Sequence, residues 1–231
     1  MKKLVVLTGA GISADSGIPT FRGADGLWEG HDVTAVASPE GWAADAQLVL
    51  RFYNERRKKM HEVEPNAGHY AVAELEEHFE VVVITQNIDN LHERAGSSKI
   101  IHLHGELSKV RSTVDETLVY EWEGWEVKWG DTCEKGSQLR PHIVWFGEMV
   151  PMMEVAMHEV ADADLVLVVG TSLVVYPAAS LLHYAPSDAP LFCVDPGIDK
   201  GMFGKEVHLI AEGAAAGMPK MKELLIREYK D

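Results

Sequence analysis

The sequence is poor in cysteine, in basic residues and in long hydrophobic runs. Cys133 and Cys193 are the only cysteines in 231 residues, which excludes a disulfide framework and a cysteine-based zinc site. Lys and Arg number 21 against 36 Asp and Glu, and the net charge of −15 argues against nucleic-acid binding. No segment approaches the roughly 20 apolar residues that cross a bilayer, and we expect no secretory signal. These absences favour a cytoplasmic protein that binds small molecules or a basic protein partner.

Short apolar runs of strand length recur along the chain, and most are rich in Val or Ile. They lie at residues 4–7, 81–84, 100–103, 165–169, 191–194 and 207–210. Helical segments are expected between them, at 39–62, 67–77, 153–161, 178–184 and 218–230. Continuous apolar strands that alternate with helices predict an α/β fold, with a doubly wound parallel sheet covered on both faces.

Two insertions interrupt this alternation, at residues 24–64 and 106–140. We expect them to meet in space as a smaller domain over the carboxyl edge of the sheet, which leaves 1–23, 65–105 and 141–231 for the larger domain. In the second insertion, Trp125, Val127 and Trp129 would share one face of an extended strand. With Trp122 they predict a small aromatic core, and an exposed aromatic patch is the alternative.

A glycine-rich turn follows the first apolar run. Gly9, Gly11 and Ala14 fit the pattern G-x-G-x-x-G/A, in which backbone N–H groups face a pyrophosphate. The acidic ribose ligand expected about 20 residues later is missing, which argues against a dehydrogenase. Phe21 and Arg22 add an aromatic ring and a cation near the same turn. The alternative is a tight strand–helix turn without a ligand.

Polar residues follow the next two apolar runs. Gln86, Asn87 and Asp89 can hold an amide or a ribose, although Asn87 or Asp89 could also cap a helix. His104 can serve as a general base near neutral pH. A metal pair with His102 has no third ligand at a recognisable spacing, and a core position is the alternative for His102.

Small residues mark the last two candidate contacts. Gly170, Thr171 and Ser172 close a strand and offer hydroxyls to phosphate or ribose oxygens, or else form an ordinary turn. The glycine–alanine stretch at 213–217 opens the last helix. It permits either the approach of a flat ring such as adenine or close helix–sheet packing.

Taken together, these residues resemble the sirtuin family of NAD-dependent protein-lysine deacylases. The resemblance covers nearly the whole chain and depends on a set of motifs in this order: 9–13 with Phe21 and Arg22, 85–89, His104-Gly105, 144–148, 170–172 and 213–217. It implies a Rossmann-like large domain and a small domain, with NAD and an acylated lysine of a protein or peptide in the cleft between them. The acyl group would pass from lysine to ADP-ribose as nicotinamide leaves.

The resemblance also implies a role for each matched residue. His104 would be the catalytic base, with Asn87 and Asp89 at the nicotinamide and its ribose. The main chain of Val144, Trp145, Phe146 and Gly147 would pair with the substrate as an added strand. The NAD-binding residues would be Gly9, Ala10, Gly11, Ser13, Phe21, Arg22, Gln86, Asn87, Asp89, Gly170, Thr171, Ser172, Asp195, Ala214 and Ala215.

The chain departs from the family pattern in its small domain. Sirtuins usually carry two Cys-x-x-Cys pairs there, whereas Cys133 stands alone in this segment. We therefore predict no structural zinc and hypothesise that the tryptophans replace the metal as the local core. Asp195 stands where the family often has an amide side chain, and it would accept hydrogen bonds from ribose hydroxyls.

Two further residues indicate an acyl preference. Tyr53 and Arg56 lie three apart, hence on one helical face. With Ala37 they resemble the acyl pocket of class III sirtuins, which prefer succinyl and malonyl groups, because Arg grips a carboxylate in bidentate fashion. The alternative is that Arg56 is one more solvated cation on a basic helix.

Two other functions remain open at this point. One is an NAD-dependent ADP-ribosyltransferase, and the other is a non-catalytic sensor of NAD or ADP-ribose. His104, Asn87 and Asp89 argue against the sensor, which would not need a base. The sequence leaves the oligomeric state and the protein targets open.

Overall fold

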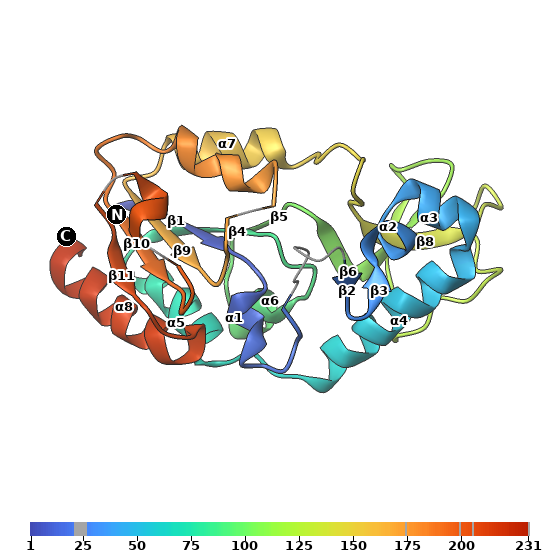
Figure 1. Cartoon of the computed structure of the whole chain (residues 1–231), viewed down its shortest axis with the longest axis horizontal. Coiled ribbons are helices and arrows are strands. Elements are labelled where there is room, and N and C mark those ends of the chain that lie inside the picture. Colours follow the sequence, from blue (N-terminus) through green and yellow to red (C-terminus); the bar gives the residue numbers. More distant parts are fainter. Residues whose placement is uncertain (21–26, 174, 199, 205, 231) are drawn as a thin grey trace.

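A six-stranded parallel sheet forms the larger part of the molecule (Figure 1). The computed structural model describes residues 1–20, 27–173, 175–198, 200–204 and 206–230. The strand order is β11-β10-β9-β1-β4-β5. Winding therefore proceeds in both directions from β1, which puts a topological switch point between β1 and β9. The strands are β1 (Lys3–Thr8), β4 (Glu80–Thr85), β5 (Ile100–His102), β9 (Leu165–Val169), β10 (Leu191–Val194) and β11 (His208–Ile210).

Helices cover both faces of the sheet, as the continuous apolar strands predict. Alternate residues of β9 belong to opposite cores: Leu165 and Leu167 pack on the side of α5 (Ala67–Glu74) and α8 (Ala214–Tyr229), and Val166 and Val168 pack on the other side. That other side is covered by α7 (Met153–Ala161) and the 3₁₀ helix η3 (Ala178–Tyr184). The predicted α/β fold class is therefore confirmed. In the described part of the chain, no helix has the length and apolar character that a membrane span needs.

The two insertions meet in a smaller module beside the sheet (Figure 1). Phe52 and Tyr53 from the first insertion pack against Leu107 and Ile143 in one hydrophobic cluster. The module's antiparallel sheet has the order β7-β6-β8, and its last strand ends beyond residue 141, where we predicted the domain boundary. The module contains β2 (Leu27–Trp28), β3 (His31–Asp32), α2 (Val33–Val36), α3 (Pro39–Ala44), α4 (Ala46–Glu62), β6 (Gly105–Ser112), β7 (Val119–Glu121) and β8 (Leu139–Ile143).

The helix predicted over 39–62 is in fact two helices. Asp45 interrupts it between α3 and α4, and its side chain accepts a hydrogen bond of 2.9 Å from the Leu48 N–H. An Asp that accepts such a bond is a typical N-cap, because it satisfies an amide that has no partner within the helix. The segment predicted at 178–184 is also a 3₁₀ helix rather than an α-helix.

The predicted aromatic core is wrong. Residues 122–129 form no strand, and Trp125 and Trp129 are 41% and 60% exposed. Val127 is buried instead, and the Asn54 side chain holds its backbone with hydrogen bonds of 2.9 Å from Nδ2 and 3.0 Å to Oδ1. An amide side chain can pair with both backbone groups of a residue in this way. Only Trp122 of the three tryptophans packs against the local hydrophobic cluster.

Candidate active site

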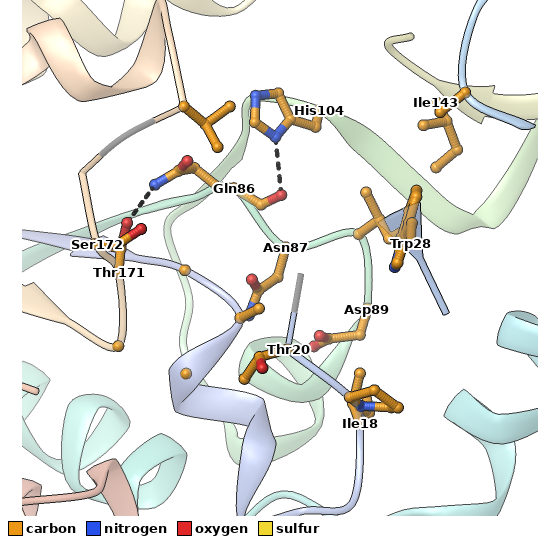
Figure 2. A pocket seen from close by; sticks show the side chains of 18 of the residues that line it. Ile18, Thr20, Trp28, Gln86, Asn87, Asp89, His104, Ile143, Thr171 and Ser172 are labelled. Carbon is orange, nitrogen blue, oxygen red and sulfur yellow. Dashed lines mark hydrogen bonds between the residues drawn. The ribbon is translucent and has the colours of Figure 1, made fainter. Parts of the chain in front are cut away.

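A cleft of about 540 Å³ lies where the carboxyl ends of the parallel strands face the smaller module. Figure 2 shows part of its lining, with Gln86, Asn87 and Asp89 on the segment that follows β4. Most residues predicted to bind cofactor or substrate line this cleft. They are Gly9, Ala10, Gly11, Ala37, Tyr53, Gln86, Asn87, Asp89, His104, Val144, Trp145, Phe146, Gly147, Gly170, Thr171, Ser172 and Asp195.

The remaining predicted residues are either outside the described part of the chain or absent from the cleft lining. Phe21 and Arg22 fall outside the described residues, and Ser13 and Arg56 lie behind the lining. Ala214 is buried in the core, and the Ala215 N–H donates to Asp15 Oδ2 at 3.1 Å. The cleft is lined there by Asp15 and Gly213 instead.

Sequence reasoning missed several other lining residues. Among them, Trp28 and Thr20 reach the cleft from the segment around the first insertion. Their positions in the sequence gave no signal for this, because they depend on how the insertion folds back over the sheet. Asp15 could have been suspected, since it is a carboxylate that directly follows Ala14, the last residue of the glycine motif.

The glycine turn after β1 packs against the turn after β9. The Gly9 N–H donates to the Val169 carbonyl at 3.1 Å, and the Gly11 N–H donates to the Gly170 carbonyl at 2.8 Å. A Cβ on Gly11 would lie 2.6 Å from the Gly170 Cα, which leaves no room for a side chain. These two amides therefore do not face a ligand, which corrects the prediction. The glycines instead form a part of the cleft wall that carries no side chains, at the switch point between β1 and β9.

Ser13 is the centre of a buried hydrogen-bond network next to this glycine turn. Its hydroxyl donates to Asp89 Oδ2 at 3.0 Å and accepts from Asn87 Nδ2 at 3.1 Å. His69 Nε2 lies 3.4 Å from the same oxygen, and its Nδ1 accepts a hydrogen bond from the Asn66 N–H. The proton of His69 therefore sits on Nε2 and is donated to Ser13. Burial lowers the pKa of His69 to about 4, so the ring is neutral at neutral pH.

Asp89 is held in one orientation by this network. Its second oxygen, Oδ1, accepts from the Leu91 N–H at 3.1 Å, so both carboxylate oxygens have partners. Burial raises the pKa of Asp89, although the hydrogen bonds from Leu91 and Ser13 oppose that shift. Asp89 points toward Thr20 in Figure 2. A fixed, desolvated carboxyl group is suited to interact with a cationic group in the cleft.

His104 has the geometry of a general base. Its Nδ1 lies 3.0 Å from the Gln86 carbonyl oxygen (Figure 2), and a carbonyl can only accept, so Nδ1 carries the proton. Nε2 then keeps its lone pair. Burial lowers the pKa of His104 although the hydrogen bond to Gln86 opposes it, so the ring is neutral at pH 7. Gln86 Nε2 in turn donates to Thr171 Oγ1 at 3.1 Å, which joins the ends of β4 and β9.

His102 has a different environment. Its Nδ1 donates to the Asn87 carbonyl at 3.1 Å, and its Nε2 lies 2.6 Å from Glu93 Oε1. Burial alone would lower the pKa of His102, but the hydrogen bond and the charge of Glu93 raise it overall. The ring thus fixes the backbone at Asn87 and forms no metal pair with His104. Glu93, His102 and Glu106 offer atoms within 4.8 Å of one another, but Lys109 is already 2.9 Å from Glu106.

The opposite end of the cleft is formed by the smaller module. The Tyr53 hydroxyl and the Trp145 Nε1 are buried and face each other, but neither makes a well-formed hydrogen bond among the described residues. Burial raises the pKa of Tyr53, so its hydroxyl stays protonated and can donate. Arg56 is one turn further along α4, where its guanidinium lies over the Phe52 ring and its Nη2 is 2.7 Å from Glu29 Oε2.

The segment expected to pair with substrate already uses three of its amides. The N–H groups of Val144 and Phe146 donate to the carbonyls of His104 and Ala37, at 3.0 and 2.9 Å. The Trp145 N–H donates to Glu148 Oε2 at 2.8 Å. The Trp145 carbonyl in turn accepts from the Glu148 N–H at 3.0 Å, so pairing with an added strand would depend on the other carbonyl groups of this segment and on Gly147.

Comparisons with known proteins identify the family. Residues 9–177 match the model of the Sir2 family. The chain belongs to this family, the sirtuins. It is 54% identical over 226 residues to a protein from Helicobacter pylori named NAD-dependent protein deacylase, and the match covers 98% of each chain.

Solved sirtuin structures share the whole fold. The crystal structure of a Sir2 homolog–NAD complex is 41% identical, with a TM-score of 0.88 over 98% of this chain and 90% of that one. The structure of a Sir2 variant with a deacetylated p53 peptide and 3'-O-acetyl ADP-ribose is 33% identical, with a TM-score of 0.79, and the match covers 98% and 93% of the two chains. These matches confirm the predicted family, the class of enzyme and NAD as the cofactor.

Among its described residues, the smaller module does not place together the ligands of the zinc site that sirtuins usually have. Cys133 Sγ lies 3.2 Å from Ser137 Oγ and 3.4 Å from Ser112 Oγ, and the two hydroxyls are 2.9 Å apart. The nearby Asp115 is paired with Lys135 at 2.7 Å. Structural zinc sites use four thiolate or imidazole ligands. One thiol among serine hydroxyls does not fit such a site.

Proposed function

We propose that this sirtuin removes acyl groups from protein lysines, transferring them to the ADP-ribose of NAD with release of nicotinamide. One observation carries the proposal: the unprotonated Nε2 of His104 shares a cleft with the fixed side chains of Asn87 and Asp89. The names of the relatives and the peptide held by a solved sirtuin support the same activity and an acylated protein as partner.

The cleft suits NAD because glycine backbone lines part of it and because polar side chains in its wall can bind the cofactor. Bound NAD would supply an electrophilic ribose carbon with nicotinamide as its leaving group. The backbone of the glycine turn after β1 lines the cleft, Thr171 and Ser172 would hold phosphate or ribose oxygens, and Asp195 would accept hydrogen bonds from ribose hydroxyls. Asn87 and Asp89 would hold the nicotinamide end, where the charge of Asp89 favours a developing cation. His104 Nε2 would take the proton of a ribose hydroxyl, which then attacks the acyl group.

The finer part of the proposal is a preference for acidic acyl groups such as succinyl and malonyl. The Tyr53 hydroxyl and the Trp145 Nε1 are buried donors that lie close to each other at the acyl end and make no well-formed hydrogen bond within the described part of the chain, so a ligand that brings an acceptor would be favourable there. Arg56 lies on the same face of α4 as Tyr53 and adds a cation whose side chain is only 10% exposed. A carboxylate would satisfy this set of donors better than a methyl group.

Substitution of Arg56 tests the acyl preference. We expect Arg56→Met to lower kcat/KM for succinyl-lysine peptides about 10- to 100-fold, because a charged hydrogen bond worth about 1.5–3 kcal/mol is lost. Acetyl-lysine turnover should change little. Mass spectrometry of the products formed with NAD and a panel of acyl-lysine peptides measures both, and also detects ADP-ribosyl transfer. Arg51→Met, on the exposed side of α4, is the matched control. An unchanged ranking of acyl groups would contradict the preference.

The absence of zinc is a further part of the proposal. The hydrogen bonds around Cys133 and the ion pair between Asp115 and Lys135 support a module that folds without metal. Metal analysis of protein purified without added zinc should find less than a stoichiometric amount. One tightly held equivalent would contradict it.

A further inference from the structure

The turn between β2 and β3 carries an unusual residue. Trp28 pairs with His31, so Glu29 and Gly30 form a two-residue hairpin turn, with φ of +47° and +80°. Two positive φ angles are typical of a type I′ turn, which favours Asn, Asp or Gly at its first position. Glu29 accepts a steric penalty there that Asn or Gly would avoid. Such strain points to a role for the side chain.

The Glu29 side chain is the anionic partner of Arg56. Its Oε2 lies 2.7 Å from Arg56 Nη2, and the side chains are 35% and 10% exposed respectively. Arg56 is held by other contacts as well: Nη1 donates to the Phe52 carbonyl, and the guanidinium carbon lies 3.1 Å from the Phe52 ring centroid and 5.1 Å from that of Trp28. Glu29, at a hairpin tip and more exposed, is therefore the partner that can leave.

The cation at Arg56 requires a partner of opposite charge. Burial lowers the pKa of Arg56 to about 10, and the charge of Glu29 opposes that shift. A desolvated guanidinium without an anion is unfavourable, and its buried Nε has no hydrogen-bond partner among the described residues. Trp28 and Tyr53, which flank Arg56, both line the cleft. An acyl carboxylate that enters beside them would meet the same guanidinium.

We propose that Glu29 competes with acidic acyl groups for Arg56 and so sets the acyl selectivity of the enzyme. With a neutral acyl group bound, Glu29 stays paired with Arg56. When a succinyl or malonyl group enters, its carboxylate replaces Glu29, which moves toward solvent. Glu29 is thus a specificity-determining residue that acts through Arg56. This inference depends on the acyl pocket proposed above.

Substitution of Glu29 by Gln removes the competitor and keeps its size. We expect Glu29→Gln to lower KM for succinyl-lysine peptides about five- to tenfold at nearly constant kcat, because only ground-state binding changes. KM for acetyl-lysine peptides should stay within about twofold, since no carboxylate is exchanged in that complex. An unchanged or raised KM for succinyl-lysine overturns the proposal.

Two further variants separate competition from a structural role. Glu29→Asn suits the left-handed position, so it should raise the melting temperature and still lower KM for succinyl-lysine. Glu55→Gln removes a charge that acts on Arg56 only through space, because Glu55 lies on the exposed side of α4 and no ion pair joins it to Arg56 among the described residues, so it should lower KM far less than Glu29→Gln does. If Glu55→Gln lowers KM as much as Glu29→Gln, the effect is one of general charge and the proposal fails.

The double variant distinguishes this inference from the acyl pocket itself. In an Arg56→Met background, Glu29→Gln should no longer change KM for succinyl-lysine, because the competitor has lost its target. If Arg56→Met alone leaves the ranking of acyl groups unchanged, the acyl pocket is contradicted. If Arg56→Met changes the ranking but Glu29→Gln does not change KM, only the role of Glu29 is contradicted.

Discussion

The two ends of the cleft differ in how their buried polar groups are satisfied. At the cofactor end, Ser13 joins Asn87 to Asp89, and both oxygens of Asp89 have partners within the protein. At the other end, the Tyr53 hydroxyl and the Trp145 Nε1 have only each other nearby and make no well-formed hydrogen bond among the described residues. A satisfied network fixes geometry before a ligand binds, whereas unsatisfied donors favour a ligand that brings acceptors. In the proposed reaction, the catalytic groups at one end would thus be fixed before a ligand binds, and an acidic acyl group would complete the other end.

The largest expected effect concerns the cofactor end. His104→Ala should lower kcat/KM for deacylation by about 10²- to 10⁴-fold, as is usual for the loss of a general base. NAD binding, measured by calorimetry, should persist, because the groups that hold Asn87 and Asp89 are unchanged. In the wild type, the activity should fall on acidification with a midpoint below pH 6.5, because burial lowers the pKa of His104. A variant that keeps more than a tenth of the activity would contradict the role.

The second prediction tests how the network at the cofactor end responds to acid. Unfolded histidine binds a proton below about pH 6.5, whereas folded His69 stays neutral down to its pKa of about 4. The free energy of unfolding should therefore fall by about 3 kcal/mol between pH 6.5 and 4 through this residue alone.

Denaturant titrations across this pH range measure that loss. His69→Gln should flatten the pH dependence, whereas a control at the exposed His61 should leave it unchanged. An equal slope in the His69 variant would show that the network does not depend on a neutral imidazole.

The smallest expected effects lie in the module that carries the acyl end. Val127→Ala should lower the free energy of unfolding by about 2 kcal/mol, since two buried methyl groups are lost and a cavity remains. Trp125→Ala should cost less than about 1 kcal/mol, because its ring is partly exposed and, within the described part of the chain, has Lys58 as its one cation partner. Thermal melts of both variants measure the difference. A larger loss of stability for Trp125→Ala than for Val127→Ala would support the aromatic core that we predicted from the sequence.

The sequence was sufficient to predict the central sheet. The run at 165–169 coincides with β9, because a strand covered on both faces is apolar at every position. The break at Asp45 was also present in the sequence, as an Asp three residues before an apolar position. An amphipathic pattern that continues across the break concealed it.

The prediction was weaker wherever a contact joins distant segments. Alternation at Trp125, Val127 and Trp129 suggested a strand, but Asn54 takes the place of a neighbouring strand, and no local pattern announces that. For the site, topology brings the strand ends to one edge, so Gln86, Asn87, Asp89 and His104 could be found. The sequence could not show that the Gly9 and Gly11 amides donate to carbonyls at the end of β9 and in the turn that follows it.

Two faces of helix α4 have different contacts: one lies at the proposed acyl pocket, and the other holds the backbone of the smaller module. Tyr53 and Arg56 face the acyl end and Glu29, whereas Asn54 and Arg57 on another side bind the backbone of Val127, Leu107 and Trp125. If the acyl pocket is as proposed, substitutions on the first face would change which modified lysine is accepted without loosening the second. New acyl specificities are therefore accessible to evolution, or to a designer, through exchange of two side chains on an otherwise untouched scaffold.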